Sequence, residues 1–176
     1  MSVVRRNPLL LICLTIATLL SACAGRPTTP AKIPELTLPM QLHVQKLQHG
    51  ERQDALLVIQ EEGDSLRFSL FDPMGAPIAR QRFESGTWER DGVLPPNPEA
   101  RELFAALLFS LTDESELSDV YPNDDWRVAD NLRTLYLGAK PRWQASYGES
   151  DEFDLRIAGD ARYHVIPVDA PEAPQP

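Results

Sequence analysis

The sequence is poor in the residues that most often build reactive centres. Only two cysteines, Cys13 and Cys23, and three histidines occur among its 176 residues. No spacing of cysteine and histidine suits zinc, and neither a nucleophile elbow nor a glycine-rich phosphate loop is present. We therefore expect a protein that is not an enzyme and that uses no metal ion and no cofactor.

Positive charge is also scarce. The formal net charge is −9, and an acidic protein is a poor partner for nucleic acid and for electrostatic docking to anionic lipid. We expect no nucleic-acid partner. Attachment to a membrane would have to come from acyl chains instead of basic side chains.

Long apolar runs are missing too, because the longest one, residues 9–20, is too short to cross a bilayer as a helix. It follows two arginines and precedes Ser21 and Ala22, which is the layout of a secretory signal. Residues 19–23, Leu-Leu-Ser-Ala-Cys, resemble a bacterial lipobox, whose cysteine is diacylated at sulfur, cleaved and acylated on its new amine. The simpler alternative is a plain signal peptide with an incidental cysteine.

Lipobox processing would make Cys23 the acylated first residue of the mature chain and its only cysteine, which leaves no disulfide within it. Each buried methylene contributes about 0.8 kcal/mol, so several acyl chains hold a protein firmly where one chain is marginal. In lipoproteins of this kind an aspartate after the cysteine marks inner-membrane retention, and this chain has Ala24 there. We therefore expect a protein anchored in the outer membrane and facing the periplasm.

The chain divides into four segments. We expect a lipoprotein signal peptide at 1–22, the acylated cysteine and a proline-rich linker at 23–39, one folded domain at 40–168 and a flexible tail at 169–176. Four prolines in the linker favour an extended, polyproline-like stalk that would hold the domain away from the bilayer.

Alternating apolar residues predict strands on both sides of one helix. The strands are expected at 42–44, 55–60, 65–71, 78–83, 87–88, 132–137, 143–147, 153–157 and 163–168. Turns such as Asp-Pro-Met-Gly at 72–75 are short, which makes neighbouring strands antiparallel. Asn97 can cap a helix over 98–111, where apolar residues recur at spacings of three and four. One helix within antiparallel strands predicts an α+β architecture or a partly open barrel.

Charged residues form no pattern typical of catalysis. The acidic stretch 113–119 is better interpreted as a solvated face than as a metal site. The three histidines are scattered, and nothing local brings any of them to a serine and an aspartate. Large apolar side chains are abundant instead, and two interpretations stay open: an ordinary packed core, or a sheet curved around a cavity. Alternation cannot distinguish a filled barrel from an open one.

The order of these segments resembles the LolB family of outer-membrane lipoproteins, which receive other lipoproteins from a periplasmic carrier. The lipobox comes first, then a strand, turn and returning strand at 70–78, an amphipathic helix at 98–111 and a late strand at 142–148. A poorly characterised branch of LolB-like lipoproteins, some of them associated with aryl-polyene lipid pathways, fits better than LolB proper. The acidic region 115–129 departs from the family's spacing.

The resemblance implies an open antiparallel half-barrel of the LolA/LolB type with a helical lid, within the α+β class. The side chains that we expect to line its cargo cavity are Phe68, Leu70, Trp88, Phe104, Leu107, Leu108 and Trp143. Met74 occupies the place of an exposed leucine that helps the family to deliver acyl chains into the membrane. The alternative is that Met74 folds back on Pro73 or Pro77.

The expected function is therefore binding. A monomeric domain would take the acyl or polyene chains of a lipidic cargo, a lipoprotein or a glycolipid-like molecule, into an apolar cavity and pass it to the outer membrane. A periplasmic carrier protein is the expected donor. One alternative is a non-catalytic scaffold or interaction lipoprotein of an envelope complex. A lipid hydrolase is less favoured and would need a histidine, such as His43 or His164, beside a serine or carboxylate in a cleft.

Overall fold

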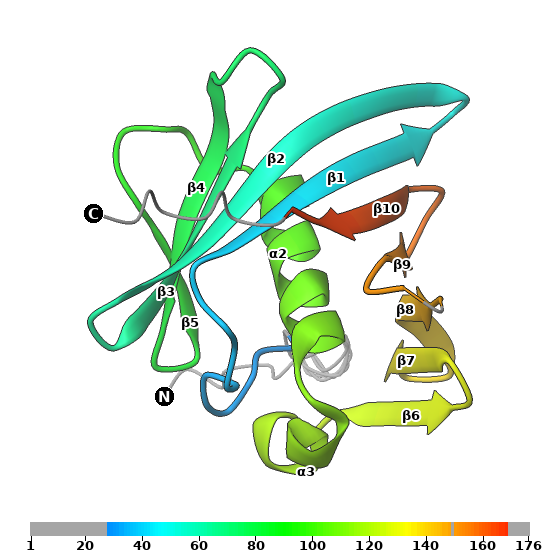
Figure 1. Cartoon of the computed structure of the whole chain (residues 1–176). Coiled ribbons are helices and arrows are strands. Elements are labelled where there is room, and N and C mark those ends of the chain that lie inside the picture. The colour runs from blue at the N-terminus through cyan, green and yellow to red at the C-terminus, as the bar shows by residue number, and fades with distance from the viewer. Residues whose placement is uncertain (1–27, 149, 169–176) are drawn as a thin grey trace, which may run out of the picture.

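The structure, a computed structural model of the chain, describes residues 28–148 and 150–168 (Figure 1). Their strands form one ten-stranded antiparallel sheet in the order β5-β4-β3-β2-β1-β10-β9-β8-β7-β6. The strands are β1 (Met40–Gln48), β2 (Glu51–Glu62), β3 (Ser65–Phe71), β4 (Pro77–Glu84), β5 (Thr87–Arg90), β6 (Asp125–Ala129), β7 (Leu132–Leu137), β8 (Lys140–Tyr147), β9 (Phe153–Ile157) and β10 (Arg162–Pro167). The helical elements are α2 (Pro98–Leu111), the 3-10 turn η2 (Glu114–Glu116) and α3 (Leu117–Val120).

The sheet consists of two meanders. Strands β1 to β5 form the first and β6 to β10 the second, and within each meander every strand pairs with the next one along the chain. The pairing of β1 with β10 joins the two. The turn between β3 and β4 closes through Asp72, whose Oδ1 accepts from the amides of Met74 at 2.9 Å and Ala76 at 2.8 Å. Gly75 takes a φ of 83° there, which only glycine adopts freely.

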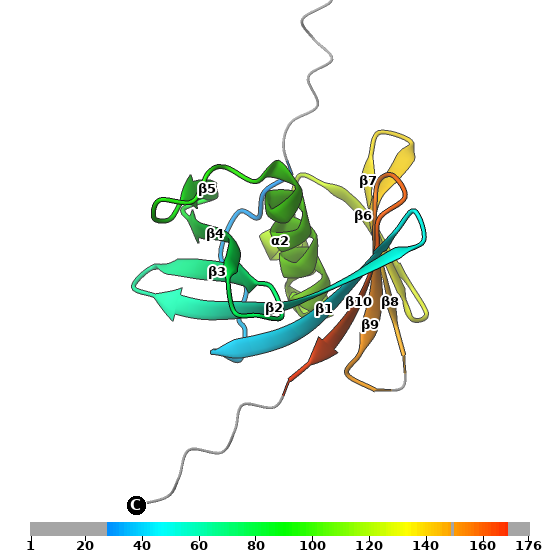
Figure 2. The same ribbon diagram turned by 90° about the horizontal axis from the view of Figure 1, so that it is seen from above.

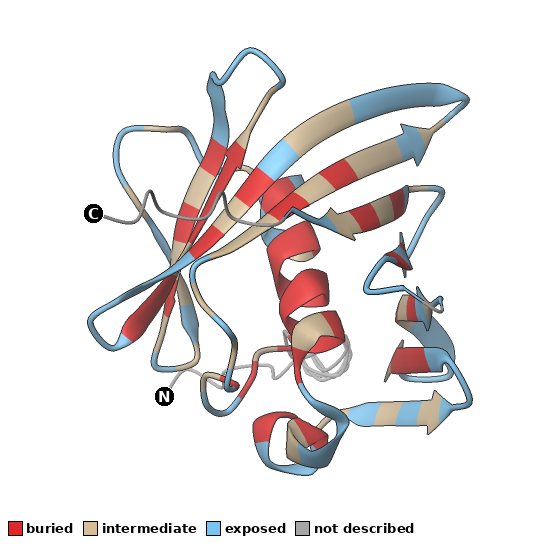
Figure 3. Ribbon diagram, in the orientation of Figure 1, coloured by how far each residue is buried: buried red, intermediate tan, exposed pale blue. Residues whose placement is uncertain are grey.

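Helix α2 links the two meanders and lies in the concave side of the curved sheet, as Figure 2 shows from above. Asn97 caps it by accepting from the amide of Ala100 at 3.0 Å, and Pro98 fits the first turn. Nine of its 14 residues are buried, so the core lies between α2 and the inward faces of the strands (Figure 3). The predicted helix over 98–111 is confirmed.

The α+β class, with its half-barrel of the LolA/LolB type, was the wrong prediction, because the fold is largely β. Among the described residues α2 has 14 residues and α3 only four, whereas the ten strands make up one continuous sheet. The sequence pattern indicated most strands correctly but not that both groups join edge to edge. A single helix against such a sheet is a small lid and does not form a separate layer.

The described part of the expected linker, residues 28–39, lies against the body instead of standing away from it. Thr28 is buried and accepts from Arg142 at 3.1 Å, and the amide of Ala31 donates to the carbonyl of Val120 at 2.7 Å. Cys23, the signal peptide, the start of the linker and the tail from 169 lie outside the described residues. No helix of the described chain is long and apolar enough to span a membrane.

Candidate functional site

The seven side chains expected to line a cargo cavity lie between the sheet and α2. Trp88 is partly buried, and the six buried ones are Phe68, Leu70, Phe104, Leu107, Leu108 and Trp143. The ring centre of Phe68 lies 5.1 Å from that of Trp88 and 5.3 Å from that of Phe104. Apart from Leu70, these side chains therefore form a packed core in this structure and not the wall of an open cavity, because α2 fills the concave side. Their part in binding a cargo stays a prediction.

An apolar cavity of about 120 Å³ opens beneath the first turns of α2, against β1 to β4. Its apolar lining comes from Val44, Ala55, Leu70, Ile78, Ala100 and Leu103. Leu70 is thus the one predicted cavity residue that borders it. Ile78 is 41% exposed, so the cavity meets solvent at an apolar side chain.

The rim of this cavity is tied together by Glu99 on the first turn of α2. Its carboxylate forms an ion pair with Lys46 of β1 and accepts from the Tyr163 hydroxyl of β10 at 3.5 Å. Burial, and then the neighbouring Glu99 charge, raise the pKa of Tyr163 well above its usual value, so the hydroxyl keeps its proton. The N-terminal turn of α2 is thereby held to the β1–β10 pair through one carboxylate.

Met74 stands at the tip of the β3–β4 turn and is 90% exposed. It does not fold back on Pro73 or Pro77. The same turn leads into Ile78 at the mouth of the cavity, so two exposed apolar side chains follow each other closely on one hairpin. An exposed, flexible and apolar methionine is unusual at a turn unless it meets another apolar surface.

Farther along α2, Glu102 joins the helix to the second meander. Its two oxygens accept from Arg142 Nε and Nη2 at 2.9 Å each, and Oε1 also accepts from Trp143 Nε1 at 2.7 Å. Partial burial alone would raise the pKa of Glu102, but these hydrogen bonds and the guanidinium charge hold it below its ordinary value. Glu102 is therefore ionised at neutral pH and fixes the middle of the helix.

The C-terminal end of α2 is held by an arginine from β7. Arg133 is buried, and its Nη1 donates to the carbonyls of Phe109, Ser110 and Thr112 at 3.1, 3.2 and 2.6 Å. The last turn of α2 contains no basic residue of its own. Arg133 therefore supplies the positive charge that the carbonyl end of a helix favours.

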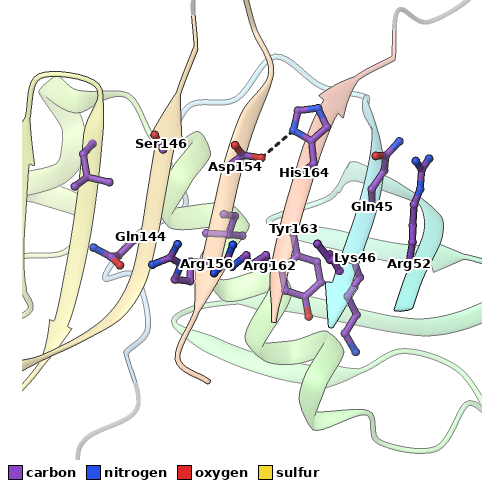
Figure 4. Close-up of a pocket in the computed structure, with 13 residues that line it drawn as sticks. Gln45, Lys46, Arg52, Gln144, Ser146, Asp154, Arg156, Arg162, Tyr163 and His164 are labelled. Carbon is purple, nitrogen blue, oxygen red and sulfur yellow. Dashed lines mark hydrogen bonds and ion pairs between the residues drawn. The ribbon is translucent and has the colours of Figure 1, made fainter. Parts of the chain in front are cut away.

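His164 lies beside the carboxylate of Asp154 in a groove, as a hydrolase would need, but among the described residues no serine joins this pair. His164 Nδ1 on β10 lies 2.9 Å from Asp154 Oδ1 on β9 (Figure 4). Ser146 on β8 lies opposite Asp154, on the side of β9 that is away from His164. Asp154 stands between them, so Ser146 and His164 are two strands apart, or about 9.5 Å at the usual strand spacing. His43 pairs with Asp54 at 3.0 Å on the same outer face. No group of three or more metal-ligating side chains occurs among the described residues.

The part of the chain that contains both meanders and α2 also matches a known family. Residues 40–164 match the family described as "Protein of unknown function (DUF3261)". The chain belongs to the DUF3261 family. No curated protein matches it. The match to DUF3261 names no activity, and it links the chain neither to LolB nor to aryl-polyene pathways.

Three arginines of this DUF3261 domain were missed by the sequence analysis. Arg133 occurs in an alternating strand, where a charged residue is normally assigned to the solvent side, but it shares the inward face with Leu135. Arg156 and Arg162 do alternate with buried residues, and that signal was available. The sequence does not show that Arg156 and Arg162 lie opposite each other, because this depends on the pairing of β9 with β10.

Proposed function

We propose that this DUF3261 protein is an outer-membrane lipoprotein, anchored through acylated Cys23 and facing the periplasm. It binds the acyl or polyene chain of a lipidic cargo and passes the cargo to the membrane. It acts as a monomer, without a chemical step or a cofactor, and receives the cargo from a periplasmic carrier protein. The observation that carries the proposal is the apolar cavity beneath α2, with the exposed Ile78 at its mouth and the exposed Met74 in the turn of the same hairpin.

The size of the cavity limits what it holds while α2 is in place. A dry apolar cavity of about 150 Å³ takes one benzene ring, and this cavity has about 120 Å³. It therefore admits only the end of a chain. Burial of more of the chain, at about 25 cal/mol per Å² of apolar surface, requires the first turn of α2 to move outward.

The contacts of α2 support such a movement. At its first turn the Lys46–Glu99 pair involves a Glu99 side chain that is 60% exposed, and exposed pairs contribute about 0–1 kcal/mol. At its other end the buried Arg133 binds three carbonyls. The helix would therefore open only at its first turn, ahead of Glu102, whose bonds to Arg142 and Trp143 hold the rest of α2 in place.

One further function is favoured by a specific observation. The close-packed interior around Phe68 and Phe104 is what a non-catalytic interaction module of an envelope complex would have. Such a module needs no cargo. The two functions differ in whether an apolar chain binds at the mouth beneath α2.

The test is binding of a fluorescent fatty acid to the full chain and to the variants Ile78→Asp and Leu137→Asp. Both residues are exposed on the surface, at 41% and 50%, and only Ile78 borders the cavity. A charge at the mouth is expected to weaken binding at least tenfold in Ile78→Asp, while Leu137→Asp binds as the wild type does. Failure of the wild type to bind, or equal binding by both variants, would refute lipid binding here and favour the interaction module.

A further inference from the structure

The face of the sheet that points away from α2 carries a groove of about 650 Å³ across β1, β10, β9 and β8 (Figure 4). Side chains alternate along a strand, so the strand registers arrange its outward residues in two rows. One row consists of Leu47, Arg162, Arg156 and Gln144, and the other of Gln45, His164, Asp154 and Ser146. The groove and the cavity beneath α2 thus lie on opposite faces.

Two arginines in the first row have no ionic partner among residues 28–148 and 150–168. Arg156 and Arg162 are directly opposite each other on β9 and β10, and neither forms a salt bridge or a side-chain hydrogen bond with any described residue. The remaining charged side chains of the groove are paired, and these pairs are Arg52 with Asp54, His164 with Asp154 and Lys46 with Glu99.

This placement costs stability in the free protein. Like charges directly opposite on neighbouring strands repel, because their Cβ atoms are only about 4.5–5.5 Å apart. The chain as a whole has a net charge of −9, so enough carboxylates exist to neutralise both arginines, yet none of the described ones does. A ligand with two negative charges would remove the repulsion.

The neighbouring side chains fit a phosphate group. Each guanidinium presents a planar set of donors that matches two phosphate oxygens. Gln144 lies opposite Arg156 on β8 and adds a neutral amide donor beside it. Asp154, the carboxylate in the groove, belongs to the other row and is engaged by His164 at 2.9 Å.

We propose that this outer groove binds a phosphate dianion between Arg156 and Arg162, with Gln144 as a further donor. The site does not depend on the cavity beneath α2 or on the function proposed for it. The phosphate belongs either to a small soluble molecule or to a lipid headgroup, and the experiment separates the two sources.

The experiment is calorimetric titration of the full chain with pyrophosphate in one arm and with dihexanoyl phosphatidic acid in the other. Dihexanoyl phosphatidylcholine is the zwitterionic control. The variant is Arg156→Gln/Arg162→Gln, and its matched control is Arg90→Gln/Lys140→Gln, which removes the same charge at exposed positions outside the groove. We expect the groove variant to lose at least tenfold in affinity and the control to keep it.

Thermal unfolding without ligand gives a second readout. Removal of either arginine is expected to leave the midpoint unchanged or to raise it, because the repulsion is relieved, whereas a structural role would lower it. Binding of pyrophosphate identifies a soluble phosphate, and binding of phosphatidic acid alone identifies a headgroup. Absence of binding in both arms, or equal affinity of the groove variant and its control, overturns the proposal.

Discussion

Replacement of Arg133 by methionine tests how α2 is held, because this side chain is the cation at the carbonyl end of the helix. Its Nη1 donates to Phe109, Ser110 and Thr112. One nitrogen cannot make three full hydrogen bonds, so we count one charge-assisted bond, about 1.5–3 kcal/mol. A buried cation at a helix C-terminus adds up to about 2 kcal/mol. Methionine avoids the cost of burying a charge, which leaves an expected loss of about 3 kcal/mol.

The measurement is the free energy of unfolding from urea denaturation of the full chain. Arg133→Lys keeps the charge but loses the planar set of donors, and an intermediate loss of about 1–2 kcal/mol is expected. Arg127→Met is the matched control, because within the described part of the chain Arg127 only stacks on Tyr136 of the next strand, at 5.1 Å. This replacement should lower the free energy of unfolding by less than about 1 kcal/mol. If Arg133→Met unfolds within about 1 kcal/mol of the wild type, the account of the helix end is refuted.

Two other changes test the middle of α2. The pKa of Glu102 in the folded protein is below the ordinary 4.5. The ionised carboxylate therefore stabilises the folded state above pH 4.5, and this contribution is lost as the pH falls through the pKa of the folded protein. Glu102→Gln should therefore differ most from the wild type in urea midpoint near pH 7 and least near pH 3, and a pH-independent difference would contradict this. Phe104→Ala should cost about 3–5 kcal/mol by denaturation if the interior is packed, and a loss below about 1 kcal/mol would indicate an open cavity.

The parts of the fold that the sequence predicted best depend on local signals. Helix α2 begins and ends as expected, since its cap, its first-turn proline and its apolar spacing all lie within the helix or beside it. Strand β6 (Asp125–Ala129) was missed because its outward residues are exposed and its inward ones only half-buried. Its identity as a strand comes from pairing with β7, which no local pattern reports.

The candidate site was harder to predict, because it depends on how much space the helix leaves. The apolar residues of β3 and α2 were identified, but their spacing is the same whether Phe68 meets Phe104 or faces a void. Arg133 was missed for a different reason. Its partners are main-chain carbonyls, which have the same chemistry in every sequence, so no complementary residue could have indicated the contact.

The seam between β1 and β10 has a consequence for how the chain folds and where its ends emerge. Every other strand pairing joins neighbours in sequence, so each meander can form from local contacts. The seam joins opposite ends of the domain, and its formation therefore has the largest cost in loop-closure entropy. Leu42 near the start of β1 lies opposite Pro167 at the end of β10. The two ends of the sheet-forming chain therefore lie side by side, and residues 28–39 lead from this point to α3 and β8, where Ala31 and Thr28 are bound.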